Sequence, residues 1–158
     1  MKVKFKVKFS DIDSGWVNVF IISDNQTVLA DSISYVPYDT LGDLVDVLDM
    51  LYYNKQSSIE KVVIMNTEPL EYELRFHQNG TNIVLDIYEY PDCRRIPNTE
   101  THLFSINGDY ELVCKPFWRA LRNMESLHTP EELSHRWPGG FPSRALNELS
   151  HKIKAHRK

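Results

Sequence analysis

Cysteine and glycine are both scarce in this sequence, and the two shortages exclude several kinds of protein. The 158 residues include two cysteines, Cys93 and Cys114, which do not form a CxxC pair. Two cysteines are too few for a disulfide framework or a four-thiolate zinc site, so we expect reduced thiols, with Cys114 on a buried helix face. The six glycines form neither of the glycine-rich loops that hold nucleotide phosphates. No cofactor is therefore predicted.

Long apolar segments are missing as well. No apolar run approaches the roughly 20 residues that a membrane-spanning helix requires. The first residues, MKVKFKVKF, alternate lysine with apolar residues and lack the unbroken apolar stretch of a secretory signal. We therefore expect a cytoplasmic protein that makes no use of a membrane.

Basic residues are rare over one long part of the chain. Residues 10–90 contain 3 Lys and Arg against 14 Asp and Glu, whereas residues 91–158 contain 11 against 8. Binding to nucleic acid needs positive charge opposite the phosphates, so no nucleic-acid partner is predicted. The acidic section suits a basic protein partner instead.

Period-two alternation of apolar and polar residues runs through most of residues 1–106. In residues 2–9, KVKFKVKF, the apolar side chains point one way and the lysines the other, as in a half-buried strand. Asn79-Gly80 separates two such runs and is a strong hairpin signal, while Ser10–Gly15 is predicted to be a turn. The predicted strands are residues 2–9, 16–23, 27–36, 61–67, 71–78, 81–90 and 102–106.

Helical spacing marks the segments between and after these strands. Leucine and valine recur every three or four residues from Leu41 to Leu51, which predicts a helix ending near Tyr53. Pro116 is expected to kink or restart a second helix. A capping box at residues 129–132 predicts a short helix that ends near residue 137. The expected helix starts are Asp39 or Thr40, Asn107 or Asp109, Thr129-Pro130, and Pro142 or Ser143.

These elements predict an α+β protein: an antiparallel sheet of six or seven strands with helices packed on one face. One domain is expected to cover residues 1–158, because no linker divides the chain. Residues 1–106 would be mainly β with one helix, and residues 107–158 would be helical. The basic residues 151–158 are expected to form a frayed tail.

No motif of the sequence predicts a catalytic residue or a metal ligand. Asp11–Gly15 is similar to the start of a calcium loop, but Gly15 stands where a third oxygen ligand is needed, Trp16 where glycine is needed and Ile22 where glutamate is needed. The histidine pairs at 128 and 135 and at 151 and 156 lack the spacing of a helical metal site. A catalytic site assembled from distant residues stays open, because a triad needs no local motif.

Four aspartates lie on one side of the first predicted helix. On a helical wheel Asp39, Asp43, Asp46 and Asp49 fall opposite the leucines, and none has a lysine four residues later. The row is either a solvated face or a surface that recognises a basic partner. In the second case Tyr38, Tyr52 and Tyr53 at the helix ends are the expected anchors.

A second candidate site lies at the proline- and glycine-rich bend after residue 135. Trp137 and Phe141 flank this bend, which is either a lid stapled onto the core or the wall of a groove. A pocket between the sheet and the C-terminal helices would place them near His77 and His102, the histidines predicted in or beside strands.

Three stretches resemble an uncharacterised bacterial family over roughly residues 15–125. They are Gly15-Trp16-Val17, Leu41-Gly42-Asp43-Leu44, and Glu68-Pro69 with Glu71-Tyr72. The resemblance implies no catalytic residues. In its size, its acidity and its α+β pattern, the chain is also similar in build to the immunity proteins that neutralise bacterial toxins.

Three functions follow as hypotheses. The first is a non-enzymatic interaction domain, concretely an immunity-type protein that occludes a basic, nuclease-like toxin with its acidic helix. The second is a small enzyme or ligand-binding domain with a pocket between the sheet and the C-terminal helices. The third is a self-associating structural domain, for example a dimer formed through an open sheet face or edge.

Overall fold

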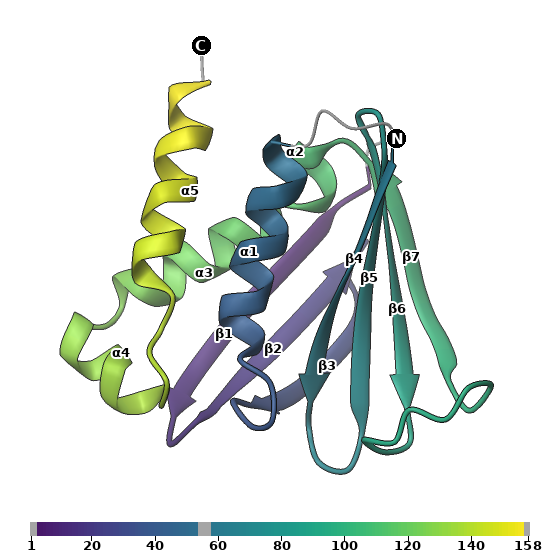
Figure 1. Ribbon diagram of the computed structural model, residues 1–158, viewed down its shortest axis with the longest axis horizontal. Helices are drawn as coiled ribbons and strands as arrows, with labels where there is room; N and C mark the ends of the chain where they lie inside the picture. The colour runs from purple at the N-terminus through teal and green to yellow at the C-terminus, as the bar shows by residue number, and fades with distance from the viewer. Residues whose placement is uncertain (1–2, 54–57, 157–158) are drawn as a thin grey trace.

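The computed structural model describes residues 3–53 and 58–156. Within these ranges seven strands form one antiparallel sheet in chain order, and five helices lie on one face of it (Figure 1). This confirms the predicted α+β architecture. The elements are β1 Phe5–Asp13, β2 Trp16–Ser23, β3 Gln26–Ser34, α1 Thr40–Tyr53, β4 Ser58–Asn66, β5 Glu71–Asn79, β6 Asn82–Tyr90, β7 Thr101–Gly108, α2 Tyr110–Val113, α3 Lys115–Ser126, α4 Pro130–Arg136 and α5 Ser143–Ala155.

The sheet consists of two parts joined at a single point. In the described ranges β3 and β4 pair through one residue pair, Ser34 with Asn66, and α1 lies in the connection between the two strands. The two edge strands of the sheet approach each other: the ring of Phe5 in β1 stacks on the ring of Phe104 in β7, with centroids 5.8 Å apart. The sheet is therefore curled, and its concave side receives the helices (Figure 1).

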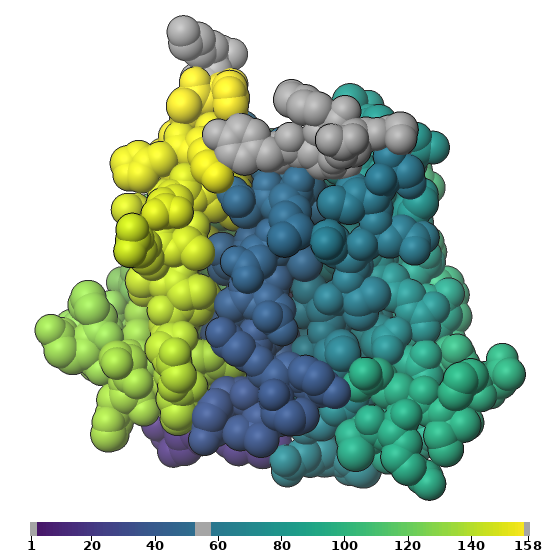
Figure 2. Space-filling view, viewed as in Figure 1, coloured from purple at the N-terminus to yellow at the C-terminus, as the bar shows by residue number. Residues whose placement is uncertain are grey.

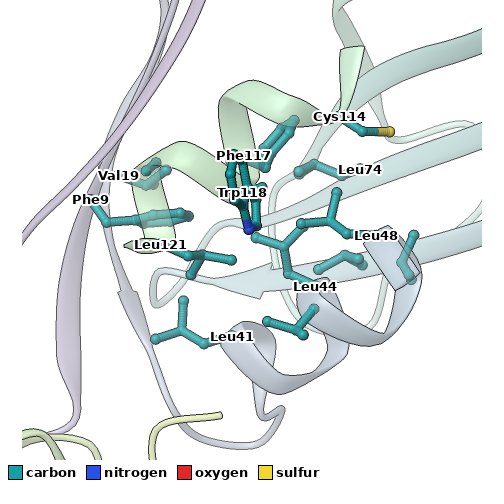
Figure 3. Close-up of a cluster of buried hydrophobic side chains, with 14 of the residues drawn as sticks. Phe9, Val19, Leu41, Leu44, Leu48, Leu74, Cys114, Phe117, Trp118 and Leu121 are labelled. Atoms are coloured by element: carbon teal, nitrogen blue, oxygen red, sulfur yellow. The ribbon is translucent and has the colours of Figure 1, made fainter. Parts of the chain in front are cut away.

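The core lies between the helices and this concave face. Figure 3 shows Leu41, Leu44 and Leu48 of α1 directed toward Phe117 and other apolar side chains of α3, as the leucine spacing predicted. Since these α1 leucines are almost fully buried, the opposite side of α1 has to face solvent. Burial of this face fixes the rotation of α1 and thereby the position of its aspartates.

The predicted turn at Ser10–Gly15 is largely wrong. β1 continues through Asp13, and only Ser14-Gly15 forms the turn. The strand continues because its register with β2 shifts between Ser10 and Asp13, where Asp11 takes a φ of 53°. This β-bulge accommodates the polar residues and still buries Ile12 completely.

The helical part follows the predicted breaks, with one correction at its end. Pro116 lacks a backbone N–H, and the helix is interrupted just before it: α2 ends at Val113 and α3 begins at Lys115. Residues 151–155 are not a frayed tail but the last turns of α5, because Ile153 is buried and Lys152 pairs with Asp49. None of the helices in the described ranges has the length and apolarity needed to cross a membrane.

The two cysteines occupy different environments. Cys114 is fully buried between α2 and α3, and this burial raises the pKa of its thiol. Cys93 is exposed in the loop between β6 and β7. Cys114 therefore packs as a small apolar side chain, as expected.

Candidate functional site

The acidic side of α1 lies open to solvent between α5 and β4 (Figure 2). The hydroxyl of Thr40 donates to the carbonyl of Ile64 at 2.7 Å and holds the start of the helix against β4. Asp39 caps the helix, because its Oδ1 accepts from the backbone N–H of Gly42 at 3.2 Å. The beginning of the acidic row is thus fixed by the sheet and by its own capping bond.

The four aspartates fall into two pairs. Asp39 and Asp49 make contacts with the C-terminal segment: Asp39 Oδ1 accepts from the indole N–H of Trp137 at 3.3 Å, and Asp49 pairs with Lys152 at 2.7 Å. Asp43 and Asp46 are exposed, and no side chain of residues 3–53 or 58–156 forms a hydrogen bond or an ion pair with their carboxylates. Two uncompensated charges therefore remain on the open helix face.

The environment of these two carboxylates disfavours their ionised form. Partial burial, together with the negative charges of Asp39 and Asp46, raises the pKa of Asp43. Partial burial, followed by the charges of Asp39 and Asp49, raises the pKa of Asp46. The row therefore carries a repulsion that a bound cation would relieve.

Replacement of Asp46 by asparagine is expected to stabilise the free protein. Asparagine and aspartate have similar helix propensities, and removing like charges near positions i±3 and i±4 gains a few tenths of a kcal/mol at an exposed site, about 0.2–0.5 at pH 7. Because the pKa of Asp46 is raised in the folded protein, its ionisation costs stability, and the gain from asparagine is present at neutral pH. The gain disappears below pH 3.8, where the carboxyl is protonated in the folded and in the unfolded protein.

Urea unfolding of the two proteins across this pH range measures the difference. Asp49→Asn is the matched contrast, because it removes the ion pair with Lys152 and is expected to give no gain. Equal effects of the two substitutions, or a gain that persists at low pH, would contradict this account of the row.

The structure turns Tyr38 and Tyr52 away from the acidic face of α1. The Tyr38 hydroxyl accepts from Arg95 at 2.8 Å, and the Tyr52 hydroxyl lies 2.8 Å from Nδ1 of His156 in a contact between α1 and α5. The side chain of Tyr53 lies outside the described part of the chain. Among the described side chains of this face, Met50 is an exposed apolar one, one turn after Asp46 and 44% exposed.

The candidate histidines lie on the sheet face opposite the helices. His77 is 3.0 Å from Glu60 on β4, and His102 is 2.9 Å from Asp86 on β6. The ring of His102 also contacts Tyr88, with centroids 4.9 Å apart. Trp137 and Phe141 are on the helix side, so the structure does not bring the four residues into one pocket.

The bend after α4 covers the core and borders the acidic row. Trp137 is 0% exposed and its ring packs edge-on against Tyr35, which matches the lid interpretation. The N–H of Gly15 donates to the carbonyl of Arg136 at 2.8 Å and ties the bend to the β1–β2 turn. Beside it lies an open hollow of about 540 Å³, bordered by Asp39, Phe141 and Arg144 among others. The acidic row therefore ends at a surface depression.

A buried polar cluster lies under the loop between β6 and β7, and the sequence did not reveal it. Arg95 in this loop bonds to Glu71 at 2.6 Å, to Glu73 at 3.0 Å and to the hydroxyl of Tyr38 at 2.8 Å. Glu71 is 0% exposed and also accepts from Asn66 at 2.5 Å. The hydrogen bonds to Tyr38 and Glu71 raise the pKa of Arg95, which stays charged. The cluster locks the loop to β5 and to the segment before α1.

One signal for this cluster was present in the sequence. Glu71, Glu73 and Arg75 alternate with Tyr72, Leu74 and Phe76 along one strand, which places the three charged residues on one face. Arg95, the partner of Glu71 and Glu73, lies in a polar loop and cannot be distinguished there by sequence from its neighbour Arg94. Only the folded loop selects the arginine that enters the cluster.

In the described ranges no three side chains of the metal-ligating types converge. The open features are the acidic helix face, the histidine-bearing sheet face and shallow surface hollows. Comparison of the chain with protein-family models, with curated proteins and with solved structures gave no match in any of the three.

Proposed function

We propose that this protein is a non-enzymatic interaction domain that binds a basic partner protein through the acidic face of α1, with toxin immunity as its concrete role. The observation that carries the proposal is the pair Asp43 and Asp46, exposed and without a cationic partner in the described structure. An arrangement that disfavours its own charges gains most when a cation approaches.

The proposed mechanism is occlusion of a basic cleft on the partner. The uniform charge of the row would steer the encounter and raise the association rate at low salt. Met50 would add apolar contact at one end of the row, and the hollow beside Asp39 would receive a protruding partner side chain at the other. Since α1 is anchored to β4 and α5, this surface would bind with little rearrangement.

Charge reversal on α1 is expected to abolish binding. The double variant Asp43→Lys with Asp46→Lys should weaken the complex by about 100-fold or more, because it replaces attraction by repulsion at two positions. The test compares wild type and variant as affinity baits in a lysate of the source organism, and then measures Kd with the purified partner at increasing salt. Wild-type affinity should fall as salt screens the charges.

The matched control reverses two exposed charges elsewhere. Glu60→Lys with Glu131→Lys changes the net charge by the same amount on β4 and α4, and it should leave the captured partner in place. A partner retained equally by all three baits, or lost equally with both variants, would refute a role for α1. A partner whose own activity is unaffected by saturating wild-type protein would refute occlusion.

A further inference from the structure

A second open hollow lies between the beginning of β1, α2 and the start of α3. Its volume is about 610 Å³, within the range of small-molecule sites. Its apolar lining is supplied by Val3 and Phe5 from the chain start and by Leu112 and Pro116 from the helices. Figure 1 shows α2 next to the start of β1, which is the edge strand of the sheet.

The charged groups around this hollow are unevenly satisfied. Asp109 accepts from the backbone N–H of Leu112 at 3.0 Å as the cap of α2. Glu111 pairs with Lys115 at 2.5 Å and with Arg119 at 2.8 Å. Lys4 and Lys6 also line the hollow, and in the described part of the chain their ammonium groups have no ion-pair partner. The carboxylates of Asp109 and Glu111 thus already have partners, whereas the ammonium groups of Lys4 and Lys6 have no ion-pair partner among the described residues.

We propose that this hollow binds a small amphipathic anion, with an apolar body and one carboxylate, sulfonate or phosphate group. The apolar body would lie against Phe5, Leu112 and Pro116, where it would lose contact with water. The anionic end would lie at the rim beside Lys4 and Lys6. This site lies apart from the acidic face of α1, and its test does not depend on the proposed protein partner.

Titration calorimetry with decanoate tests the inference directly. Decanoate should bind saturably with one molecule per chain, and decyltrimethylammonium, which has the same chain length and the opposite charge, should bind at least about fivefold more weakly. Lys4→Gln with Lys6→Gln should weaken decanoate binding by about fivefold, since exposed ion pairs contribute modestly. Lys8→Gln is the matched control, because Lys8 is exposed on the same strand but does not line the hollow.

A second variant separates the hollow from a diffuse charge effect. Leu112→Trp would fill the hollow and should abolish decanoate binding in a protein that still unfolds cooperatively. The proposal is overturned if decanoate does not bind saturably, if decyltrimethylammonium binds equally well, or if the lysine double variant binds like Lys8→Gln. The lysine variants change exposed residues only, so they remain informative even if Leu112→Trp fails to fold.

Discussion

Replacing Arg95 by alanine is expected to lower the free energy of unfolding by about 3–5 kcal/mol, the range seen when one partner of a buried ion pair is removed. The reason is Glu71, which is 0% exposed and whose only cationic partner in the described structure is Arg95. Without the guanidinium, a carboxylate would remain buried with a single donor from Asn66. Chemical denaturation of wild type and variant measures the loss.

The neighbouring arginine is the control for this prediction. Arg94 is exposed and pairs with Asp92 at 2.7 Å, so Arg94→Ala should change stability far less than Arg95→Ala. Glu71→Gln should restore part of the loss in the Arg95→Ala background, because a neutral amide costs less to bury than a carboxylate. Equal effects of Arg95→Ala and Arg94→Ala would contradict the buried cluster.

Truncation of Trp137 to alanine is expected to lower the free energy of unfolding by about 3–5 kcal/mol, the usual cost of removing a buried aromatic side chain. Its indole is 0% exposed, contacts Tyr35, and donates to Asp39 at the start of the acidic row. The substitution would therefore open a cavity under the bend and release the first carboxylate of the row. Thermal unfolding and denaturant titration both report the change.

Trp137→Phe separates packing from the hydrogen bond. Phenylalanine keeps much of the apolar contact but has no N–H for Asp39, so a smaller loss of about 1–2 kcal/mol is expected. If Trp137→Ala were nearly neutral, the bend would not be a lid, and the alternative of a groove wall at Trp137 and Phe141 would gain weight.

The helices and strands with clear periodic or capping patterns were predicted from the sequence, and the segment that was predicted wrongly has a physical reason. The leucines of α1 lie every three or four residues, and the structure buries them as that spacing requires. The capping box at Thr129 and Glu132 is present in α4 with both of its hydrogen bonds. The bulge at Asp11 was missed, because polar residues in a row favour a turn locally and only pairing with β2 keeps them in a strand.

The end of α5 and the placement of the tyrosines were decided by tertiary contacts. Residues 151–155 look like a solvated basic tail, but the burial of Ile153 and the contact of Lys152 with Asp49 hold them in a helix. Tyr38 and Tyr52 flank the acidic helix in sequence, yet each turns toward a different neighbour, Arg95 and His156. Sequence neighbours at helix ends share no common direction, so their grouping was not predictable.

The sequence by itself determined the α+β architecture, the strand and helix order, and the acidity of one helix face, because these depend on periodicity and composition along the chain. Only the tertiary structure decided which aspartates are compensated, which arginine enters the buried cluster, and where surface hollows form. Those features depend on residues far apart in the chain, such as Asp49 and Lys152, and no local pattern encodes their distance. Among the described residues, folding left Asp43 and Asp46 without a cationic partner, and the proposed function is argued from that observation.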